Sequence, residues 1–271
     1  MSNNETKGTA LITGASSGIG AVYADRLARR GFDLILVARN KARLAALAER
    51  LRSETGRSVA TIAADLTNKA DLARVEAALR EDARITLLVN NAGTGSVAPL
   101  LSANIDSMED MIALNVSALT RLTYAAAPGF VARGQGTIVN IASVVGISPE
   151  ALNGVYGATK AYVIAFSHSL QHELADKGVR IQAVLPGATA TEFWDLAGMP
   201  HQNLPKAIVM SAADMVDAAL AGLDQGERIT IPALPDSGEW DAYEAARRAM
   251  AGKLSNAVPA ARYRVAQPQH A

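Results

Sequence analysis

The sequence contains no cysteine, and aromatic residues make up only 4% of its 271 residues. Without thiols the chain can form neither a disulfide nor a thiolate nucleophile, and it can offer no sulfur ligand to a metal. We therefore expect a protein of the reducing cytoplasm, without a metal site. Because 49% of the residues are hydrophobic and few of these are aromatic, the core must be built from aliphatic side chains.

The chain also lacks a net charge and a long apolar run. Lys and Arg number 26, as do Asp and Glu, so no overall field draws the protein to nucleic acid or to an acidic membrane. The polar residues 1–8 do not resemble a signal peptide. No apolar run approaches the ~20 residues that span a bilayer. We expect a soluble protein with no nucleic-acid partner and no membrane partner.

Short aliphatic and β-branched runs alternate with segments of helical periodicity such as 41–54. The runs lie at Thr9–Thr13, Asp33–Val37, Ser58–Ala63, Ile85–Val89, Thr137–Ile141, Val179–Leu185 and Arg228–Ile231. Strands that are apolar throughout and separated by helices are typical of a parallel sheet covered on both faces. The pattern predicts a doubly wound, Rossmann-like α/β fold with a seven-stranded sheet.

No stretch rich in Pro, Ser or Gly divides the chain, which predicts a single domain. We place this domain at residues 8–253, after a flexible N-terminus at 1–7. The least regular internal stretch, about 187–211, is too long for an ordinary connection and predicts a lid over a site. The final residues, 254–271, lack periodicity and predict an irregular tail.

The first predicted strand ends in a glycine-rich turn that leads directly into a helical segment. Glycine allows a tight turn, and the unpaired N–H groups at a helix N-terminus bind phosphate. The spacing G-x-x-x-G-x-G differs from the G-x-G-x-x-G pattern, so a plain turn of small residues is the alternative. The candidate dinucleotide-binding residues here are Gly14, Ser16, Ser17, Gly18, Ile19 and Gly20.

Basic residues follow the second predicted strand, where NAD-binding domains usually carry an acid that binds the ribose 2′-hydroxyl. Arg39 and Arg43 can bind a 2′-phosphate instead, with Asn40 between them. This predicts NADP(H) as the preferred coenzyme, with NAD(H) possible. The alternative is that Arg39 is only a solvated surface residue.

Further candidate coenzyme contacts follow the third and fourth predicted strands, at the sheet edge where ligands bind in this fold class. Asp65 and Leu66 follow the third strand, and an aspartate there can accept a hydrogen bond from an adenine amino group. Asn91, Ala92 and Gly93 follow the fourth, where small residues let the backbone approach a coenzyme. Taken singly, each is equally well a turn or cap residue.

Tyr156 and Lys160 are four residues apart in a helical segment and therefore lie on one helix face. A neighbouring ammonium group favours the ionised phenol, which would make Tyr156 a general acid or base. Ser143 ends the fifth predicted strand and can hydrogen-bond a substrate carbonyl. Asn115 is a polar amide in an apolar helical stretch, either a satisfied core residue, the mark of a helix kink, or the holder of a water linked to Lys160.

In this order the motifs resemble those of the short-chain dehydrogenase/reductase superfamily, over about residues 7–235. The resemblance implies a Rossmann-like fold of seven strands and a catalytic tetrad of Asn115, Ser143, Tyr156 and Lys160. It implies that the segment after the sixth strand contacts the nicotinamide half of the coenzyme through Pro186, Gly187, Thr189 and Thr191. It further implies a homo-oligomer, a dimer or a tetramer, built on the long helices near 106–132 and 156–177.

The function that follows is hydride transfer between NADP(H) and a carbonyl or secondary alcohol, with Tyr156 as general acid or base. Apolar lid residues predict a small-molecule substrate with an apolar part; they are Phe193, Trp194, Leu196 and Met199. One alternative is a catalytically silent NADP(H)-binding module that senses redox state, and another is a Rossmann-like methyltransferase. His168 and His172 lack the order of a zinc protease motif, so we predict no metal there.

Overall fold

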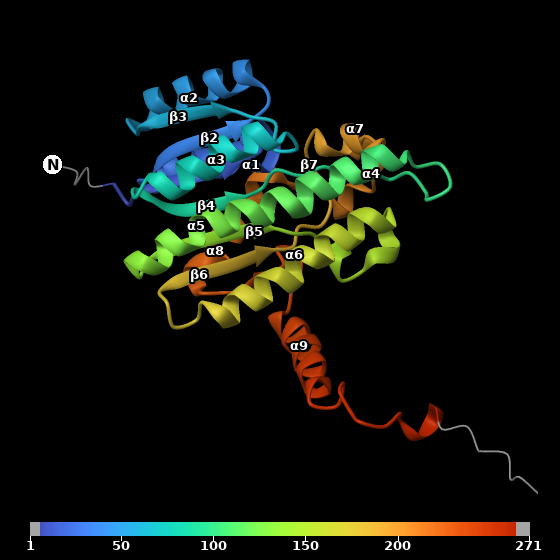
Figure 1. Ribbon diagram of the computed structural model, residues 1–271. Coiled ribbons are helices and arrows are strands. Elements are labelled where there is room, and N and C mark those ends of the chain that lie inside the picture. The colour runs from blue at the N-terminus through green and yellow to red at the C-terminus, as the bar shows by residue number, and fades with distance from the viewer. Residues whose placement is uncertain (1–5, 264–271) are drawn as a thin grey trace, which may run out of the picture. The chain divides into compact units, whose positions relative to one another are not determined.

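A parallel sheet of seven strands forms the centre of the computed structural model, which describes residues 6–263 (Figure 1). Its strands lie in the order β3-β2-β1-β4-β5-β6-β9, and each neighbouring pair is parallel. They are β1 (Thr9–Thr13), β2 (Asp33–Ala38), β3 (Val59–Ala63), β4 (Ile85–Asn90), β5 (Gly136–Ile141), β6 (Val179–Val184) and β9 (Ile229–Thr230). The predicted fold class is confirmed, and each strand lies within a residue or two of its predicted place.

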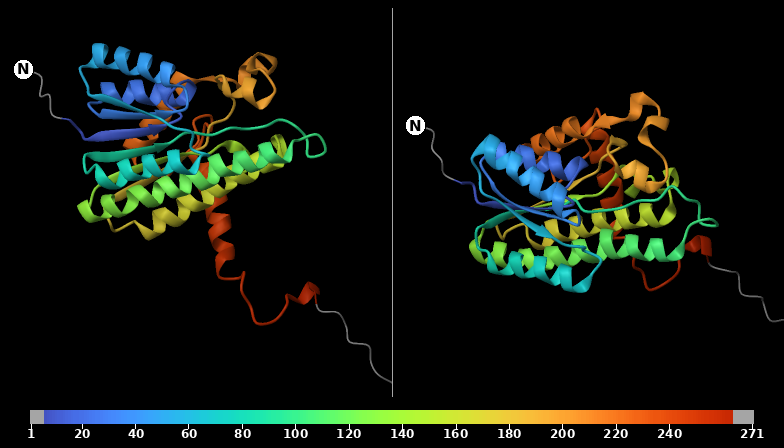
Figure 2. Two further views of the ribbon diagram at one scale, coloured as in Figure 1. Left: turned by 45° about the horizontal axis from the view of Figure 1, so that its top comes forward. Right: turned by 90° about the horizontal axis from the view of Figure 1, so that it is seen from above.

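Helices cover both faces of this sheet, as the view from above shows (Figure 2). One face buries aliphatic side chains of α1 (Gly18–Arg29), α2 (Lys41–Thr55) and α8 (Ala212–Gln225). The other face buries those of α3 (Lys69–Glu81), α5 (Leu119–Arg133) and α6 (Gly154–Glu173). Because both faces are covered, the strands are apolar along most of their length, which is the pattern that the sequence displays.

The strand order reverses between β1 and β4. From β1 the chain adds β2 and β3 on one side, and it then returns to add β4, β5, β6 and β9 on the other. At the point of reversal, the connection that follows one strand passes over one face of the sheet, and the connection that follows its neighbour passes over the other face. A crevice opens there, outside the carboxyl ends of the strands, and it is where this fold class binds ligands.

The long helix predicted near 106–132 is interrupted. It consists of α4 (Ile105–Ile112), a π-helical segment (Ala113–Ala118) and then α5. A π-helical segment has i to i+5 hydrogen bonds, so each bond encloses one residue more than in an α-helix; such segments frequently mark functional sites. Asn115 lies within it, so the helix irregularity that we considered at this residue is present.

The predicted lid has more regular structure than its composition suggests. Two short parallel strands, β7 (Thr189–Ala190) and β8 (Met210–Ser211), pair at its base. Between them lie α7 (Phe193–Ala197) and two single 3₁₀ turns, His201–Asn203 and Lys206–Ile208. The segment is thus closed at its base by strand pairing rather than being one long irregular loop.

The described chain divides into two compact units, with the boundary between Pro232 and Ala233. The second unit contains α9 (Ser237–Ala251) and a 3₁₀ turn (Ala261–Tyr263). We predicted that the Rossmann-like domain ends at residue 253, whereas the first unit ends at Pro232. The predicted flexible N-terminus, 1–7, and the predicted irregular tail, 254–271, include residues 1–5 and 264–271, which lie outside the described part. Within residues 6–263, no helix is both long enough and apolar enough to cross a membrane.

Candidate active site

A cavity of about 560 Å³ opens at the carboxyl ends of the central strands. It brings together almost every residue that the sequence singled out, from segments far apart in the chain. The predicted residues that line it are Gly14, Ser16, Ser17, Gly18, Ile19, Arg39, Asn40, Arg43, Asp65, Leu66, Asn91, Ala92, Gly93, Ser143, Tyr156, Lys160, Pro186, Gly187, Thr189 and Thr191. Two predicted site residues, Gly20 and Asn115, are not in its wall.

The glycine-rich turn lies tightly against neighbouring backbone. Gly14 has a φ of +65°, and a Cβ there would lie 2.9 Å from the Cα of Ala92. A Cβ on Gly20 would lie 2.3 Å from the carbonyl oxygen of Gly14. The last glycine of the motif therefore lets α1 pack against the turn, and its predicted contact with a coenzyme stays a prediction.

The N-terminus of α1 faces this cavity in a form suited to an anion. Ser17 is the N-cap residue, but its side chain makes no capping hydrogen bond, and the first turn contains no acidic residue. The first N–H groups of a helix have no partner within the helix and carry partial positive charge. Gly187 lines the cavity with no atom within 4 Å of the position a Cβ would occupy. These features fit a dinucleotide with its pyrophosphate at α1.

The segment after β2 supplies the predicted basic residues. Arg39 is exposed, lines the cavity and has no ion pair within residues 6–263. The side chain of Asn40 caps α2, because its Oδ1 accepts a hydrogen bond from the backbone N–H of Arg43 at 3.0 Å. The Arg43 guanidinium is paired across the cavity with Glu192, Nη1 to Oε2, at 2.6 Å.

Asp65 and Asn91 both use their side chains for structure. Oδ1 of Asp65 accepts hydrogen bonds from the backbone N–H and the hydroxyl of Thr67, at 3.0 and 2.7 Å. Nδ2 of Asn91 donates to the backbone carbonyls of Thr13 and Gly14, at 2.9 and 3.2 Å. Asn91 therefore fixes the glycine-rich turn to the end of β4, a role that the sequence reading did not give it.

Tyr156 is presented by the first turn of α6, whose N-cap is Asn153. The Asn153 Oδ1 accepts hydrogen bonds from the backbone N–H groups of Val155 and Tyr156, at 2.9 and 3.3 Å. Burial raises the pKa of Tyr156 to about 12, while a hydrogen bond with the Ser143 side chain acts in the opposite direction. The Ser143 hydroxyl also donates to the carbonyl oxygen of Pro186 at 3.3 Å.

Lys160 lies one helical turn further along, with its Nζ 5.8 Å from the centre of the Tyr156 ring. Its ammonium group donates to the carbonyl oxygen of Ile141 at 2.8 Å, and burial lowers the pKa of Lys160 to about 8. We expected Lys160 to bring the pKa of Tyr156 down. In the structure the desolvation of the phenol outweighs any such effect, so Tyr156 is held in its protonated form.

Asn115 is buried beside this pair, and its side chain has three hydrogen bonds. Oδ1 accepts from the backbone N–H of Thr94 at 3.0 Å, and Nδ2 donates to the Thr94 carbonyl at 2.8 Å and to the Thr159 hydroxyl at 3.1 Å. The amide thus joins the segment after β4 to α6. Its predicted link through a water to Lys160 stays a prediction.

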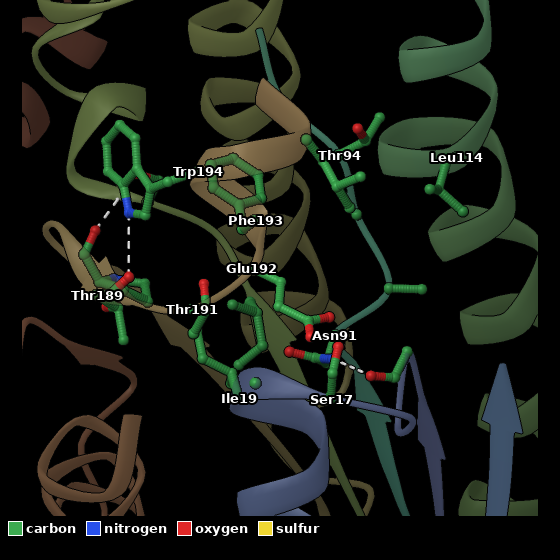
Figure 3. A pocket seen from close by; sticks show the side chains of 18 of the residues that line it. Ser17, Ile19, Asn91, Thr94, Leu114, Thr189, Thr191, Glu192, Phe193 and Trp194 are labelled. Atoms are coloured by element: carbon green, nitrogen blue, oxygen red, sulfur yellow. Dashed lines mark hydrogen bonds between the residues drawn. The ribbon is translucent and has the colours of Figure 1, made fainter. Parts of the chain in front are cut away.

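The lid supplies an aromatic wall over Tyr156. The Phe193 ring lies 5.7 Å from the Tyr156 ring, centre to centre, and a Cβ on Gly95 would lie 2.4 Å from its Cζ. Trp194 is anchored by a hydrogen bond from Nε1 to the Thr189 carbonyl at 3.0 Å (Figure 3). Leu196 lines the cavity as predicted, whereas Met199 does not.

Sequence reasoning missed several apolar wall residues and one acid. Leu114, Val145 and Leu152 line the cavity, the last two beside Tyr156, and Glu192 lines it beside Arg43. Val145 and Leu152 lie in the short 3₁₀ region between β5 and α6, whose proximity to Ser143 and Tyr156 in the chain was the available signal. Nothing in the sequence around Glu192 indicated that its partner is a residue 149 positions away.

Comparison with known proteins agrees with this arrangement. The short chain dehydrogenase family model matches residues 8–198. An uncharacterized oxidoreductase of Staphylococcus epidermidis is 33% identical over 207 residues, which is 74% of this chain and 88% of that protein.

Two solved structures are also similar. The short-chain dehydrogenase from Sphingobium yanoikuyae in complex with NADPH is 52% identical, with a TM-score of 0.92, covering 95% of this chain and 100% of the other. The bulky-bulky ketone specific alcohol dehydrogenase from Comamonas testosteroni is 46% identical, with a TM-score of 0.88, covering 96% and 99%. With its seven-stranded sheet, its glycine-rich turn and its Ser143, Tyr156 and Lys160 at one cavity, the chain is an oxidoreductase that belongs to the short-chain dehydrogenase family.

Proposed function

We propose that this protein is an NADP(H)-dependent carbonyl reductase or alcohol dehydrogenase in which Tyr156 is the general acid or base. The observation that carries the proposal is that Ser143, Tyr156 and Lys160 lie together in the wall of a cavity that begins at the N-terminus of α1, with Nζ of Lys160 5.8 Å from the centre of the Tyr156 ring. One end of that cavity fits a dinucleotide, and the other end holds a proton donor against apolar walls.

The coenzyme we propose is NADP(H). Arg39 is exposed in the cavity wall at the end of β2, where it can bind a 2′-phosphate, and no acid stands at that strand end to repel one. The relative from Sphingobium yanoikuyae was solved in complex with NADPH, which agrees with this assignment. The chemistry that NADP(H) would supply at this site is the exchange of a hydride with the substrate carbon.

The residues of the chain supply position and the proton. Ser143 and Tyr156 donate hydrogen bonds to the carbonyl oxygen of the substrate, which stabilises the negative charge that develops there. Tyr156 then gives its proton to that oxygen in reduction, or removes it in alcohol oxidation. In the structure the pKa of Tyr156 is about 12, so the phenol carries the proton that reduction needs. Lys160 places a positive charge beside the phenol and so favours its return to the ionised form.

The substrate that we propose is a ketone or secondary alcohol with an apolar part. Val145, Leu152 and Phe193 line the cavity next to Tyr156, and Leu196 extends this wall along the lid. Such a surface favours an apolar substituent over a charged one. The relative from Comamonas testosteroni is named a bulky-bulky ketone specific alcohol dehydrogenase, which supports a ketone substrate.

The test of the chemistry is a panel of ketones, aldehydes and alcohols assayed with NADPH, NADH and their oxidised forms. The Tyr156→Phe variant is expected to lose at least about a hundredfold in kcat, because the ring keeps its packing but has no proton to transfer. NADPH binding, followed by fluorescence, should be nearly unchanged. Tyr124→Phe, which alters an exposed tyrosine on α5, is the matched control. Full activity in Tyr156→Phe would refute the assignment.

The coenzyme preference has its own test. Arg39→Ala is expected to weaken NADPH binding by about tenfold or more, since it removes a charge-assisted contact to the 2′-phosphate, and to leave NADH binding almost unchanged. Lys41→Ala removes a neighbouring exposed charge that does not line the cavity, and it should change neither affinity. Equal affinities for the two coenzymes, unaltered in Arg39→Ala, would contradict the preference.

A further inference from the structure

An acidic side chain occupies the part of the cavity where anionic phosphates are expected. Glu192 lies in the lid between Thr191 and Phe193, and its side chain extends toward Ser17 at the start of α1 (Figure 3). Its Oε2 lies 2.6 Å from Nη1 of Arg43, and it also hydrogen-bonds the Ser17 side chain. These two partners hold the pKa of the Glu192 carboxyl below its usual range, so it is ionised at neutral pH.

Both partners of Glu192 are groups suited to bind the coenzyme. Ser17 is the N-cap residue of α1, whose N-terminus attracts anions, and Arg43 lies in the first turn of α2. The adjacent Thr191 lies against the glycine-rich turn, with its Cγ2 3.1 Å from the position of a Cβ on Gly18. The lid is therefore seated on the phosphate-binding turn, and a carboxylate of the chain itself holds it there.

Charge makes this arrangement incompatible with tight coenzyme binding. NADP(H) brings a pyrophosphate and a 2′-phosphate into the region between α1 and α2, and a carboxylate within the same region repels both. Besides Arg43, the wall offers Arg39 and Lys160 as cations, while Asp65 adds a second acid. Arg43 has only one positive charge, so a phosphate bound to it competes with Glu192.

We propose that Glu192 is a residue that determines coenzyme affinity: its carboxylate is an internal anion that holds Arg43 and Ser17 until the phosphates of NADP(H) displace it. The proposal rests on the proposed coenzyme site. Displacement also frees the segment that carries Phe193, whose ring covers Tyr156, so coenzyme binding and access to the catalytic phenol are linked through one short stretch of chain. Glu192 lowers the affinity of the resting enzyme and favours release of the coenzyme after turnover.

The experiment is a titration of NADPH and NADH, without substrate, into the wild type and Glu192→Gln. The glutamine keeps the size of the side chain and removes its charge. We expect NADPH to bind about three- to tenfold more tightly to the variant, because the ion pair that competes for Arg43 and the repulsion between like charges are both removed. The gain for NADH should be smaller, because NADH has no 2′-phosphate to compete for Arg43. Stopped-flow release of NADPH should slow correspondingly.

Two further variants make the result specific. Asp195→Asn removes a charge from the same lid, at an exposed residue that does not line the cavity, and should leave both affinities unchanged. In an Arg43→Ala background, Glu192→Gln should have a smaller effect than in the wild type, because the competition for that guanidinium is gone.

Several results would overturn the proposal. Weaker NADPH binding in Glu192→Gln would mean that the carboxylate clamps the bound coenzyme instead of competing with it. An unchanged affinity, or an equal gain in Asp195→Asn, would mean that Glu192 has no specific part. Failure of the proposed function would give a different result. A wild type that binds NADPH but reduces no carbonyl compound would contradict the proposed function, while the competition between Glu192 and phosphate for Arg43 could still be measured by titration.

Discussion

Lys160 lowers the stability of the fold, although the proposed reaction requires its charge. It is buried to 6% exposure, and its ammonium group donates to the Ile141 carbonyl without a carboxylate partner among the described residues. Burying a charge without a counter-charge is unfavourable, which is why the pKa of Lys160 falls to about 8. The proposed reaction needs this charge next to Tyr156, so the fold retains a residue that destabilises it.

Replacing Lys160 with methionine should therefore stabilise the coenzyme-free protein while abolishing activity. At pH 7 the gain is expected to be about 1–3 kcal/mol, seen as a rise in Tm of several degrees. Below pH 8, Lys160 is charged in both the folded and the unfolded state, and the folded state bears the full cost of burial. Between pH 8 and 10.5 the folded protein releases this proton first, so the stability of the wild type rises and the advantage of the variant shrinks.

Thermal unfolding of both proteins between pH 7 and 10 checks this expectation. A Lys160→Met variant less stable than the wild type at pH 7 would show that the lysine has stabilising partners beyond the Ile141 carbonyl. An advantage that stays constant across the range would show that the pKa of Lys160 is not depressed.

At the scale of elements, the start of α1 depends on close packing of backbone. Gly20 lies in the first turn of α1, and the space for its Cβ is filled by the Gly14 carbonyl at 2.3 Å and by the Asn91 Nδ2 at 2.5 Å. Asn91 in turn donates to the carbonyls of Thr13 and Gly14. The helix, the glycine-rich turn and the end of β4 are thus packed as one unit, which sets the position of the N–H groups that face the cavity.

Gly20→Ala is expected to destabilise the protein by about 1–3 kcal/mol and to weaken NADPH binding, because the methyl group must push α1 away from the turn. Gly154→Ala is the matched control. Gly154 is also in a first helical turn, and nothing lies within 4 Å of its Cβ position, so its substitution should be neutral or slightly stabilising. Denaturant unfolding and NADPH titration measure the two effects, and equal stability of the two variants would contradict the packing argument.

At the scale of the whole molecule, exposed aromatic side chains mark the helices that the family resemblance assigns to subunit contacts. Tyr124 of α5 is 67% exposed and Tyr162 of α6 is 37% exposed, and both rings stack on Phe166. The Tyr162 hydroxyl and the Thr120 hydroxyl are 2.8 Å apart. Exposed apolar patches of this kind mark interaction surfaces. A homo-oligomer assembled through α5 and α6 therefore stays our prediction.

Light scattering of the purified protein is expected to give the mass of a dimer or a tetramer. A double variant, Tyr124→Glu with Tyr162→Glu, should shift the mass toward that of the monomer, because it places charges within a buried contact. Ile208→Glu, at an exposed apolar residue of the lid, should leave the mass unchanged. A wild type that is monomeric at all concentrations tested would refute the prediction.

The sequence by itself determined the sheet and predicted most of the residues that line the candidate site. Strands buried on both faces must be apolar throughout, and the helices between them must turn an apolar stripe to the sheet, so both periodicities are written locally in the chain. Because parallel strands end at one edge, residues that follow strands in the sequence were predictable as neighbours in space. For this reason the glycine-rich turn, Ser143, Tyr156 and Lys160 were found from spacing and order.

Only the tertiary structure decided what the side chains at that edge do. Gly20 and Asn91 turned out to pack and fix the turn, since their environments are made by segments about 75 residues apart in the chain. The pKa values of Tyr156 and Lys160 are shifted by burial, which no local pattern records. The pairing of Glu192 with Arg43 joins the lid to α2. Each depends on long-range packing, because desolvation and ion pairing are properties of a residue's neighbours in space and not of its neighbours in sequence.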